Sequence, residues 1–459
     1  MSNSIGNLHQ GDKVVSLDKA AIILPYSWYR APQTNEEKSI AGMLRTLQSS
    51  ILRINIFEDM FSMGLTGNIE FRDPNSLPTL TDMKGFEFLT LQFSLTGQNI
   101  QTPRTFGPLF FSIYKQTNRT QRTKGSETYT LHFCSPEIIS SFSRRFSRSY
   151  QDTPENIVKD IVSAPYGLNS KKSFKLFEET KQEIKFVVPY LRPADVLKLL
   201  VLQGQNINNE TNYMFFETLD GYNYVSFKKL LQDAIADTTI PTLYVDLGNL
   251  EETKNTQTRI KADQLEVVSG FDSLYAISEG FFSSVTIAPD VLSGQCSVEF
   301  SSIADTGSTV EYNDRQKLNN NNFYPSDLGL AMPATSKIFL IPTTHISAGN
   351  SELLRLDPDT KLRNNFIAQT LDGRNRELIG LQLRTIRGTV SGTPEIHAGK
   401  IINVVFPSPL NNKNYGPQKN DIASGRYIVV NAQHSLIADG RNGFLYQTTF
   451  EAVTDSRLS

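Results

Sequence analysis

Residues 425–453, which read GRYIVVNAQHSLIADGRNGFLYQTTFEAV, decide the fold of the C-terminal part of this chain. An apolar run at 427–430 leads to a turn rich in Asp, Gly and Asn at 439–443, and a run of alternating character follows at 444–450. Two strand-forming runs joined by turn-forming residues are typical of a β-hairpin. The stretch therefore predicts a pair of antiparallel strands.

The same pattern occurs earlier, at 107–133, which reads GPLFFSIYKQTNRTQRTKGSETYTLHF. Gly107 corresponds to Gly425 and Tyr129 to Tyr446, with one residue more in the earlier turn. Identity between the two stretches is low, so two ordinary hairpins are the alternative. Because the segments before each hairpin also match, the sequence predicts an internal repeat.

Composition sets broad limits on function. The chain has 459 residues, enough for about two to four domains. Its 45 basic and 47 acidic residues give a net charge of −2, so nothing indicates a bulk preference for nucleic acid or an acidic membrane. The two cysteines, Cys134 and Cys296, form no zinc or disulfide pattern. The N-terminus is polar and no window approaches about 18 apolar residues, so we expect cytoplasmic assembly and no membrane insertion.

Strands begin near residue 50, where apolar and polar residues alternate. The apolar positions are Leu52, Ile54 and Ile56, then Leu65, Ile69 and Phe71, then Leu89, Leu91, Phe93 and Leu95. With the hairpin at 107–133 they make about five antiparallel strands with one apolar face. Five strands in a meander commonly curl into a small barrel. We therefore expect an N-terminal arm at 1–48, with a short helix from residue 35, and a first β-barrel at 49–137.

Helices are predicted after the first barrel. Asp152, Pro154 and Glu155 favour a helix start, and the buried face of this helix is predicted to comprise Ile157, Val158, Ile161 and Val162. A second helix is predicted from Pro193, with Val196, Leu197, Leu199 and Leu200 on its apolar face. We assign 138–208 and 235–375 to an α/β domain that includes a strand at 283–287 and a helix near 359–371.

A second barrel is predicted around the α/β excursion. The Asp220-Gly221 turn predicts a hairpin near 212–229, and strands resume at 378–390 and 400–406 before the hairpin at 425–453. We assign 209–234 and 376–459 to this barrel. The fold class is therefore mainly β with α+β: two similar small antiparallel, tube-type β-barrels, the second split. Predicted core residues are Phe111, Leu131 and Phe133 in the first barrel and Val429 and Phe450 in the second.

This order of a barrel, a helical domain and a split second barrel resembles the central hub protein of contractile, T-even-like phage-tail baseplates, which is related to the hub module of type VI secretion spike proteins. The resemblance rests on INIFEDM and GLTGNIEF within 54–71, SYQDTPENIVKDIV at 149–162, FFETLDGYNYVSF at 215–227, and the closing hairpin. None of these is a strict motif. The resemblance lies in their order and spacing.

The resemblance implies a structural protein of the virion tail baseplate, assembled in the host cytoplasm. It implies a homotrimeric hub that joins a sixfold tail tube or tube initiator to a threefold central spike, with tape-measure and baseplate wedge proteins as further partners and DNA only as cargo. A duplicated barrel would turn three chains into six similar units. A neutral or slightly acidic channel wall is expected from the polar strand faces, which carry Thr66, Asn68, Thr90, Gln92, Ser94, Thr128 and Thr130.

Catalytic patterns are not found, so we expect no enzyme, no cofactor and no metal. The sequence has no P-loop, HExxH or GxSxG motif, and its histidines, at 9, 132, 345, 397 and 434, are widely spaced. His132 and His434 are interpreted as hydrogen-bonded sheet residues. The pairs Glu58–Asp59 and Glu178–Glu179 are interpreted as solvated, and the two DGRN tetrapeptides, at 372–375 and 439–442, as turns.

Three alternatives stay open. A cell-wall hydrolase of the same machine would need a poised pair of carboxyl groups. A spike protein of a type VI-like system would share the same barrels. A nucleic-acid-binding protein could use Arg144, Arg145 and Arg148, which alternate with Phe142, Phe146 and Tyr150.

Overall fold

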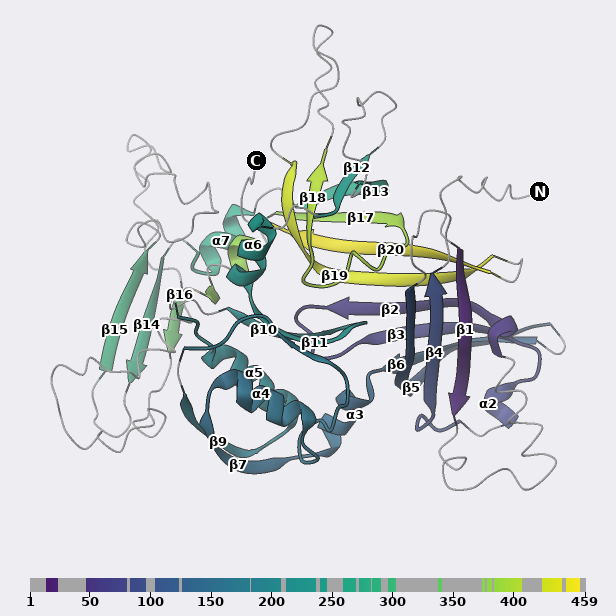
Figure 1. Cartoon of the computed structure of the whole chain (residues 1–459), viewed down its shortest axis with the longest axis horizontal. Helices are drawn as coiled ribbons and strands as arrows, with labels where there is room; N and C mark the ends of the chain where they lie inside the picture. The colour runs from purple at the N-terminus through teal and green to yellow at the C-terminus, as the bar shows by residue number, and fades with distance from the viewer. Residues whose placement is uncertain are drawn as a thin grey trace, which may run out of the picture.

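Figure 1 shows the computed structural model of the chain. The described residues are 14–23, 47–80, 83–95, 104–123, 126–181, 183–207, 212–236, 240–245, 259–269, 272–281, 283–289, 296–302, 337–340, 374–375, 378–381, 384–406, 423–439 and 443–454. The predicted helices from residue 35 and near 359–371 lie outside this part. So does the polar tract at 319–322.

The main sheet closes on itself, and one strand pair divides it into two closed circuits of strands. The first circuit contains β1 (Val14–Ile23), β2 (Ile51–Asp59), β3 (Thr66–Asp73), β4 (Phe88–Leu95), β5 (Arg104–Thr123) and β6 (Ser126–Cys134). The second circuit contains β12 (Thr242–Val245), β13 (Arg259–Ser269), β17 (Thr385–Ser391) and β18 (Ile401–Val405). Both circuits are completed by the hairpin of β19 (Gly425–Ala438) and β20 (Phe444–Val453).

The β19–β20 hairpin belongs to both circuits along different parts of its length (Figure 1). In β19, residues 425–428 pair with β18 and residues 431–437 pair with β2. In β20, Phe444 and Leu445 pair with β1, whereas residues 447–453 pair with β17. The prediction placed the whole hairpin in the second barrel. That placement is wrong, because the turn end of the hairpin buries its side chains in the first circuit.

The two circuits repeat one order of five strands. The first reads β2-β3-β6-β5-β4 and the second β13-β17-β20-β19-β18. Gly67 lies opposite Phe133 in the β3–β6 pair, and Gly388 lies opposite Phe450 in the β17–β20 pair. Each phenylalanine ring covers the glycine, since an added Cβ would come within 2.3 Å of Phe133 and 2.5 Å of Phe450. This arrangement supports the predicted repeat. The hairpin at 212–229, expected as the first part of the second barrel, is not in the second circuit, where β13 and β17 stand instead.

Separate apolar cores fill the two circuits. The first core includes Phe111, Leu131 and Phe133, and the second includes Val429 and Phe450. All five side chains are at most 1% exposed, which confirms the predicted core residues. The described part of the chain is mainly β, as predicted, since strands outnumber helices among its elements.

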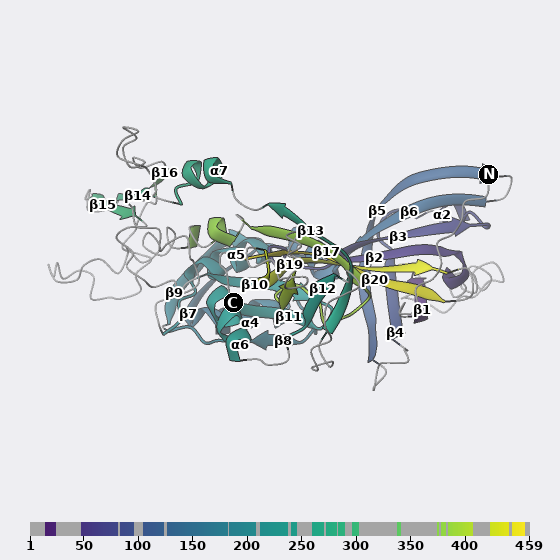
Figure 2. The ribbon, with the colours of Figure 1, turned by 90° about the horizontal axis from the view of Figure 1, so that it is seen from above.

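An α/β part surrounds a second hairpin, formed by β10 (Tyr213–Thr218) and β11 (Gly221–Ser226) and called the central hairpin below. The other elements of this part are α3 (Pro136–Ser143), β7 (Phe146–Asp152), α4 (Pro154–Ser163), β8 (Phe174–Leu176), β9 (Ile184–Leu191), α5 (Pro193–Gln203), α6 (Phe227–Ala236), α7 (Ser273–Ser278), β14 (Ser283–Pro289), β15 (Cys296–Ser302) and β16 (Lys337–Leu340). Two short helical turns, η2 (Leu47–Ser50) and α2 (Leu77–Leu80), adjoin the first circuit. Figure 2 shows the β14–β16 sheet and the first circuit at opposite ends of the molecule.

The central hairpin is buried on both faces, since every residue of its two strands is buried. One face, which includes Tyr213 and Tyr222, packs with α4 and α5. The other, which includes Met214 and Phe216, packs with residues at the base of the second circuit. The Asp220-Gly221 hairpin was predicted correctly, but its assignment to the second barrel was wrong. It forms a three-stranded sheet with β8 instead, because both its faces are apolar and each covers a different core.

For other predicted segments, the structure corrects the strand pairing or the type of element. The arm at 1–48 contains β1, which pairs with β4 and β20. The excursion at 235–375 contributes β12 and β13 to the main sheet. Residues 378–381 are helical, so the strand expected there begins only at β17. The strands expected near 283–287 and 400–406 are present as β14 and β18.

The two predicted helices are present. α4 has Pro154 in its first turn and buries Ile157, Val158, Ile161 and Val162, as predicted. α5 begins at Pro193 and buries Val196, Leu197 and Leu200, whereas Leu199 is 38% exposed. In the described part of the chain, none of the helices has the length and apolarity needed to span a bilayer.

Candidate functional site: the polar face of the main sheet

A polar sheet face runs without interruption from the second circuit into the first. Along β2, Ile54 and Ile56 point into the core, so Asn55 and Phe57 lie on the opposite face. Strand register extends this face across the molecule. One row of facing residues is Gln447, Ser435, Asn55, Asn68 and His132, and a second is Thr389, Thr449, Gln433, Phe57 and Thr66. We call these residues the polar face.

Amide and hydroxyl groups hold the polar face together where the circuits meet. The Asn55 Oδ1 atom accepts from Ser435 Oγ at 2.8 Å and from Gln433 Nε2 at 3.2 Å. The Asn55 Nδ2 atom donates to Asn68 Oδ1 at 2.8 Å. Asn55 and Ser435 are only 6% and 5% exposed. At this place the surface of the sheet therefore consists of neutral side chains that are hydrogen-bonded to one another.

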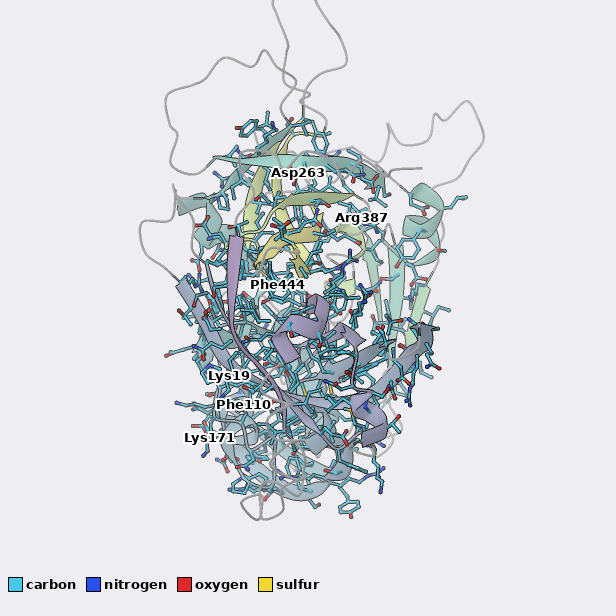
Figure 3. All side chains as sticks on the ribbon, turned by 90° about the vertical axis from the view of Figure 1, so that its right-hand side faces the viewer. Lys19, Phe110, Lys171, Asp263, Arg387 and Phe444 are labelled. Carbon is cyan, nitrogen blue, oxygen red and sulfur yellow. The ribbon has the colours of Figure 1, made fainter. Side chains whose placement is uncertain are left out.

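The charged groups at the second-circuit end of this face are paired. The Arg387 guanidinium lies 3.4 Å from Glu451 and 3.8 Å from Glu266. Figure 3, which looks onto the first-circuit end, shows Arg387 in the upper part of the molecule above Phe444. Beside it lies a depression of about 340 Å³ lined by Phe57, Glu58, Asp59, Thr66, Arg387, Asn431, Ala432, Gln433, Thr449, Phe450 and Glu451. Its lining holds three carboxylates, those of Glu58, Asp59 and Glu451, and one guanidinium, that of Arg387, so this end of the face is acidic and not basic.

Behind the polar face, a buried carboxylate joins the circuits. Glu58 is 1% exposed and its two oxygens accept from the backbone N–H groups of Leu219 at 2.7 Å and Ala398 at 2.9 Å. The His434 Nε2 atom lies 3.8 Å from Glu58, and its Nδ1 atom lies 2.8 Å from the Tyr446 hydroxyl. Burial alone would raise the pKa of Glu58, but hydrogen bonding and the charge of the nearby histidines outweigh it and lower that pKa.

Glu58 corrects one prediction from the sequence. It was interpreted as solvated, yet its position two residues beyond Ile56 places it on the core-facing side of β2. His434 is a buried, hydrogen-bonded sheet residue, as interpreted. His132 also sits in the sheet, where its Nε2 atom lies 2.8 Å from the Thr117 hydroxyl. The sequence did contain a signal for the burial of Glu58: side chains of a strand alternate between its two faces, so Glu58 lies on the same side as Ile54 and Ile56.

Other residues singled out in the sequence have structural roles. Arg144 donates to the backbone carbonyls of Pro165 and Gly167, and Arg148 stacks over Tyr150 and Tyr166. The Glu178 carboxylate accepts from Asn206 and Ser226, so it is not simply solvated, whereas Glu179 is exposed. Thr90 and Thr130 were expected on an open strand face but are buried. The DGRN tetrapeptides lie largely outside the described residues.

No constellation for metal binding appears in the described part of the chain, where histidine, cysteine and carboxylate side chains do not gather in groups of three or more. Burial raises the pKa of the Cys134 thiol to about 11, so this thiol is a poor nucleophile. The predictions of no enzyme, no cofactor and no metal stay predictions.

Comparison with solved structures finds phage tail proteins. A tail protein from Neisseria meningitidis MC58 matches with a TM-score of 0.46 and 11% identity, over 88% of this chain and 92% of that chain. The 43 kDa tail protein of prophage MuSo2 from Shewanella oneidensis matches with a TM-score of 0.44 and 10% identity, over 88% and 94%.

A type VI secretion protein matches as well. The E. coli c3393 protein, described as a component of the type VI secretion system with structural similarity to the T4 bacteriophage tail proteins gp27 and gp5, has a TM-score of 0.41 and 9% identity, over 88% of this chain and 73% of that chain. The sequence matches no protein-family model, and a search of curated proteins finds no match. The structural neighbours are thus phage tail and type VI secretion proteins.

Proposed function

We propose that this chain is a structural component of a phage tail baseplate: a homotrimeric central hub that joins a sixfold tail tube to a threefold spike. The observation that carries the proposal is the fusion of two strand circuits of the same order through one hairpin. Three such chains in a ring offer six similar units toward a tube and only three copies of every other surface. One chain can thereby serve both symmetries.

The polar face supports a role as the wall of a channel. Apart from Phe57 and His132, it is lined by Thr, Ser, Asn and Gln side chains, several of which bond to one another, and the one guanidinium beside it, that of Arg387, is paired with glutamates. A strongly basic wall would hold phosphates and slow the passage of DNA. A neutral or slightly acidic wall suits a conduit through which a tape-measure protein and then DNA pass as cargo. Tube, spike, tape-measure and wedge proteins are the partners of this proposal.

The particle mass tests the proposal. We expect the full chain, alone or co-expressed with its spike protein, to weigh three times 51.5 kDa by native mass spectrometry. A monomer at micromolar concentration in the presence of the spike contradicts the hub, as does a ring of six chains. A turbidity assay on peptidoglycan is the parallel control, since clearing by the purified chain would favour a hydrolase.

A further inference from the structure

Two neighbouring strands of the α/β part carry an excess of positive charge. β7 pairs with β9 in a two-stranded antiparallel sheet, which we call the ribbon. The segments 138–151 and 184–194 include all of β9 and all but the last residue of β7. They hold five basic residues and no acidic one, namely Arg144, Arg145, Arg148, Lys185 and Arg192. The whole chain has a net charge of −2, so the ribbon runs against the overall balance.

The arginines of the ribbon form no ion pair with a carboxylate in the described part of the chain. Arg144 donates to backbone carbonyls, and Arg148 lies over tyrosine rings. Arg145 is exposed, and the Arg192 guanidinium lies over the Phe142 ring, 5.0 Å from its centroid. Arginines on the strands of the two circuits, in contrast, are found paired with carboxylates. The ribbon therefore presents positive charge that is free to meet a partner.

Exposed apolar side chains lie among these charges. Phe142, at the end of α3, is 65% exposed, and Val187 and Tyr190, on β9, are 63% and 64% exposed. Arg192 joins the two groups, since it directly follows β9 and covers the ring of Phe142. Phe, Tyr and Arg side chains are enriched at the energetic centres of protein interfaces. We call Phe142, Arg145, Val187, Tyr190 and Arg192 the basic–aromatic face.

The backbone of Tyr190 is held in a conformation that keeps its ring outside. Its φ of +52° lies in the left-handed region, which is uncommon for residues other than glycine. The ribbon register shifts between Phe146 and Arg148, where β9 has one residue more than β7. Such a bulge changes the direction of a side chain, so Val188 and Leu191 pack inward while Tyr190 stays exposed. Residues in sparsely populated conformations cluster at functional sites.

The ribbon is the outermost layer on one side of the molecule. Its inner side packs on α4 and α5, and these helices cover one face of the central hairpin. The other face of the hairpin packs on the base of the second circuit. Figure 1 shows this order, with β7 and β9 at the bottom and the second circuit at the top. The ribbon thus points away from the second circuit, and a trimer would present it three times and not six.

We propose that the basic–aromatic face is the surface on which the threefold spike protein docks, through carboxylates that surround an apolar centre. The inference rests on the proposed function, because it takes the circuits as the side of the hub that meets the tube. Unpaired arginines attract an acidic surface, and the rings of Phe142 and Tyr190 are buried only by an apolar one. Nucleic acid suits the face less well, since the Arg192 guanidinium covers a face of Phe142 on which a base would stack.

Binding of the purified spike protein to the full chain tests the face. We expect the double variants F142A/Y190G and R145E/R192E each to bind the spike about tenfold more weakly or worse, since aromatic and arginine anchors dominate interface energies. Binding by the wild type should weaken as salt rises, and this dependence should be shallower in R145E/R192E. Both variants should keep the trimer mass in native mass spectrometry, because the substituted side chains lie outside the apolar cores.

K19E/K115E is the matched control for charge. It makes the same change of charge at two exposed lysines of the first circuit, and Figure 3 labels Lys19 at that end of the molecule. It should bind the spike as the wild type does. Y190G separates binding from folding, since glycine adopts a φ of +52° without strain. We expect it to unfold at the same or a higher urea concentration than the wild type, whereas loss of a merely structural tyrosine would lower that concentration.

The wild type and the variants decide different questions. A wild-type trimer that binds no spike contradicts the proposed hub, and the inference fails with it. Spike binding that both double variants retain overturns the basic–aromatic face and leaves the hub untouched. A labelled DNA duplex is the remaining probe. If the wild type binds it and R145E/R192E does not, while spike binding is unchanged, the face belongs to nucleic acid and the inference is overturned.

Discussion

Phe133 shows what one residue contributes to the first circuit. Its ring is fully buried, lies 4.7 Å from the Phe111 ring centroid and covers Gly67. We expect F133A to lower the free energy of unfolding by about 3–5 kcal/mol, since the truncation leaves a cavity that cannot collapse against a glycine. The control is F86A, whose side chain is 74% exposed and whose loss should stay below about 0.5 kcal/mol. Urea unfolding measures both, and equal losses would contradict this assignment.

Glu58 gives the chain a pH dependence with a defined sign. Its pKa in the folded protein is held below the ordinary value of 4.5, so its contribution to stability is present above that value and is lost as pH falls through the folded pKa. We expect E58Q to be less stable than the wild type at pH 7 by about 1–3 kcal/mol, with the difference shrinking toward acid pH. Urea titrations at several pH values test this. With E266Q, at an exposed site, the difference should stay small at every pH.

Single residues were predicted well where a local pattern fixes their environment. Phe111, Leu131 and Phe133 follow the alternation of their strands, and that alternation alone places them in the core. Glu58 also follows it, yet the groups that make its burial tolerable, Leu219 and Ala398, come from distant parts of the chain. The alternation of a strand predicts on which face a side chain lies. It does not predict which backbone N–H groups will bind a carboxylate that is buried on that face.

At the scale of elements, the glycine–phenylalanine pairs test the repeat. G67A and G388A should each place a methyl group against a ring, and we expect each to cost about 1–3 kcal/mol. Replacing Phe133 with Leu should recover part of the loss in G67A and none of it in G388A. Replacing Phe450 should show the reverse. A double-mutant cycle by urea unfolding measures the coupling, and cross-rescue would mean that the two cores are one.

Hairpins were predictable as elements but not by their partners. The turn at Asp220-Gly221 and the run at 425–453 follow from local sequence, and both hairpins form. The strands at 213–226 are apolar on both faces, which is typical of a buried strand pair, yet such a pattern does not say which cores it separates. The sequence also did not show that the β19–β20 hairpin belongs to both circuits. A long hairpin has the same sequence pattern whether its outer edges pair with strands of one barrel or of two.

At the scale of the whole molecule, chain order was the more reliable guide. The first barrel, the helical part and the late return to strands were expected in that order. The membership of β1, β12 and β13 in the main sheet was not, since these strands pair with segments far away in the chain. Their cost in loop-closure entropy is offset only by the complete sheet, so no local window carries the information.

The position of the polar face in the proposed trimeric hub gives the last prediction. If this face lies toward the axis or the subunit seams, a cysteine at Thr449 should be confined in the trimer, whereas one at Lys185, exposed on β9, should not. We expect T449C to react with a small maleimide at similar rates in monomer and trimer. With a maleimide on a bulky polymer it should react much more slowly in the trimer, because the channel excludes the polymer. K185C should show no such difference. If T449C in the trimer accepts the bulky reagent as fast as K185C does, the polar face lies on the outside and the channel must be lined by other strands.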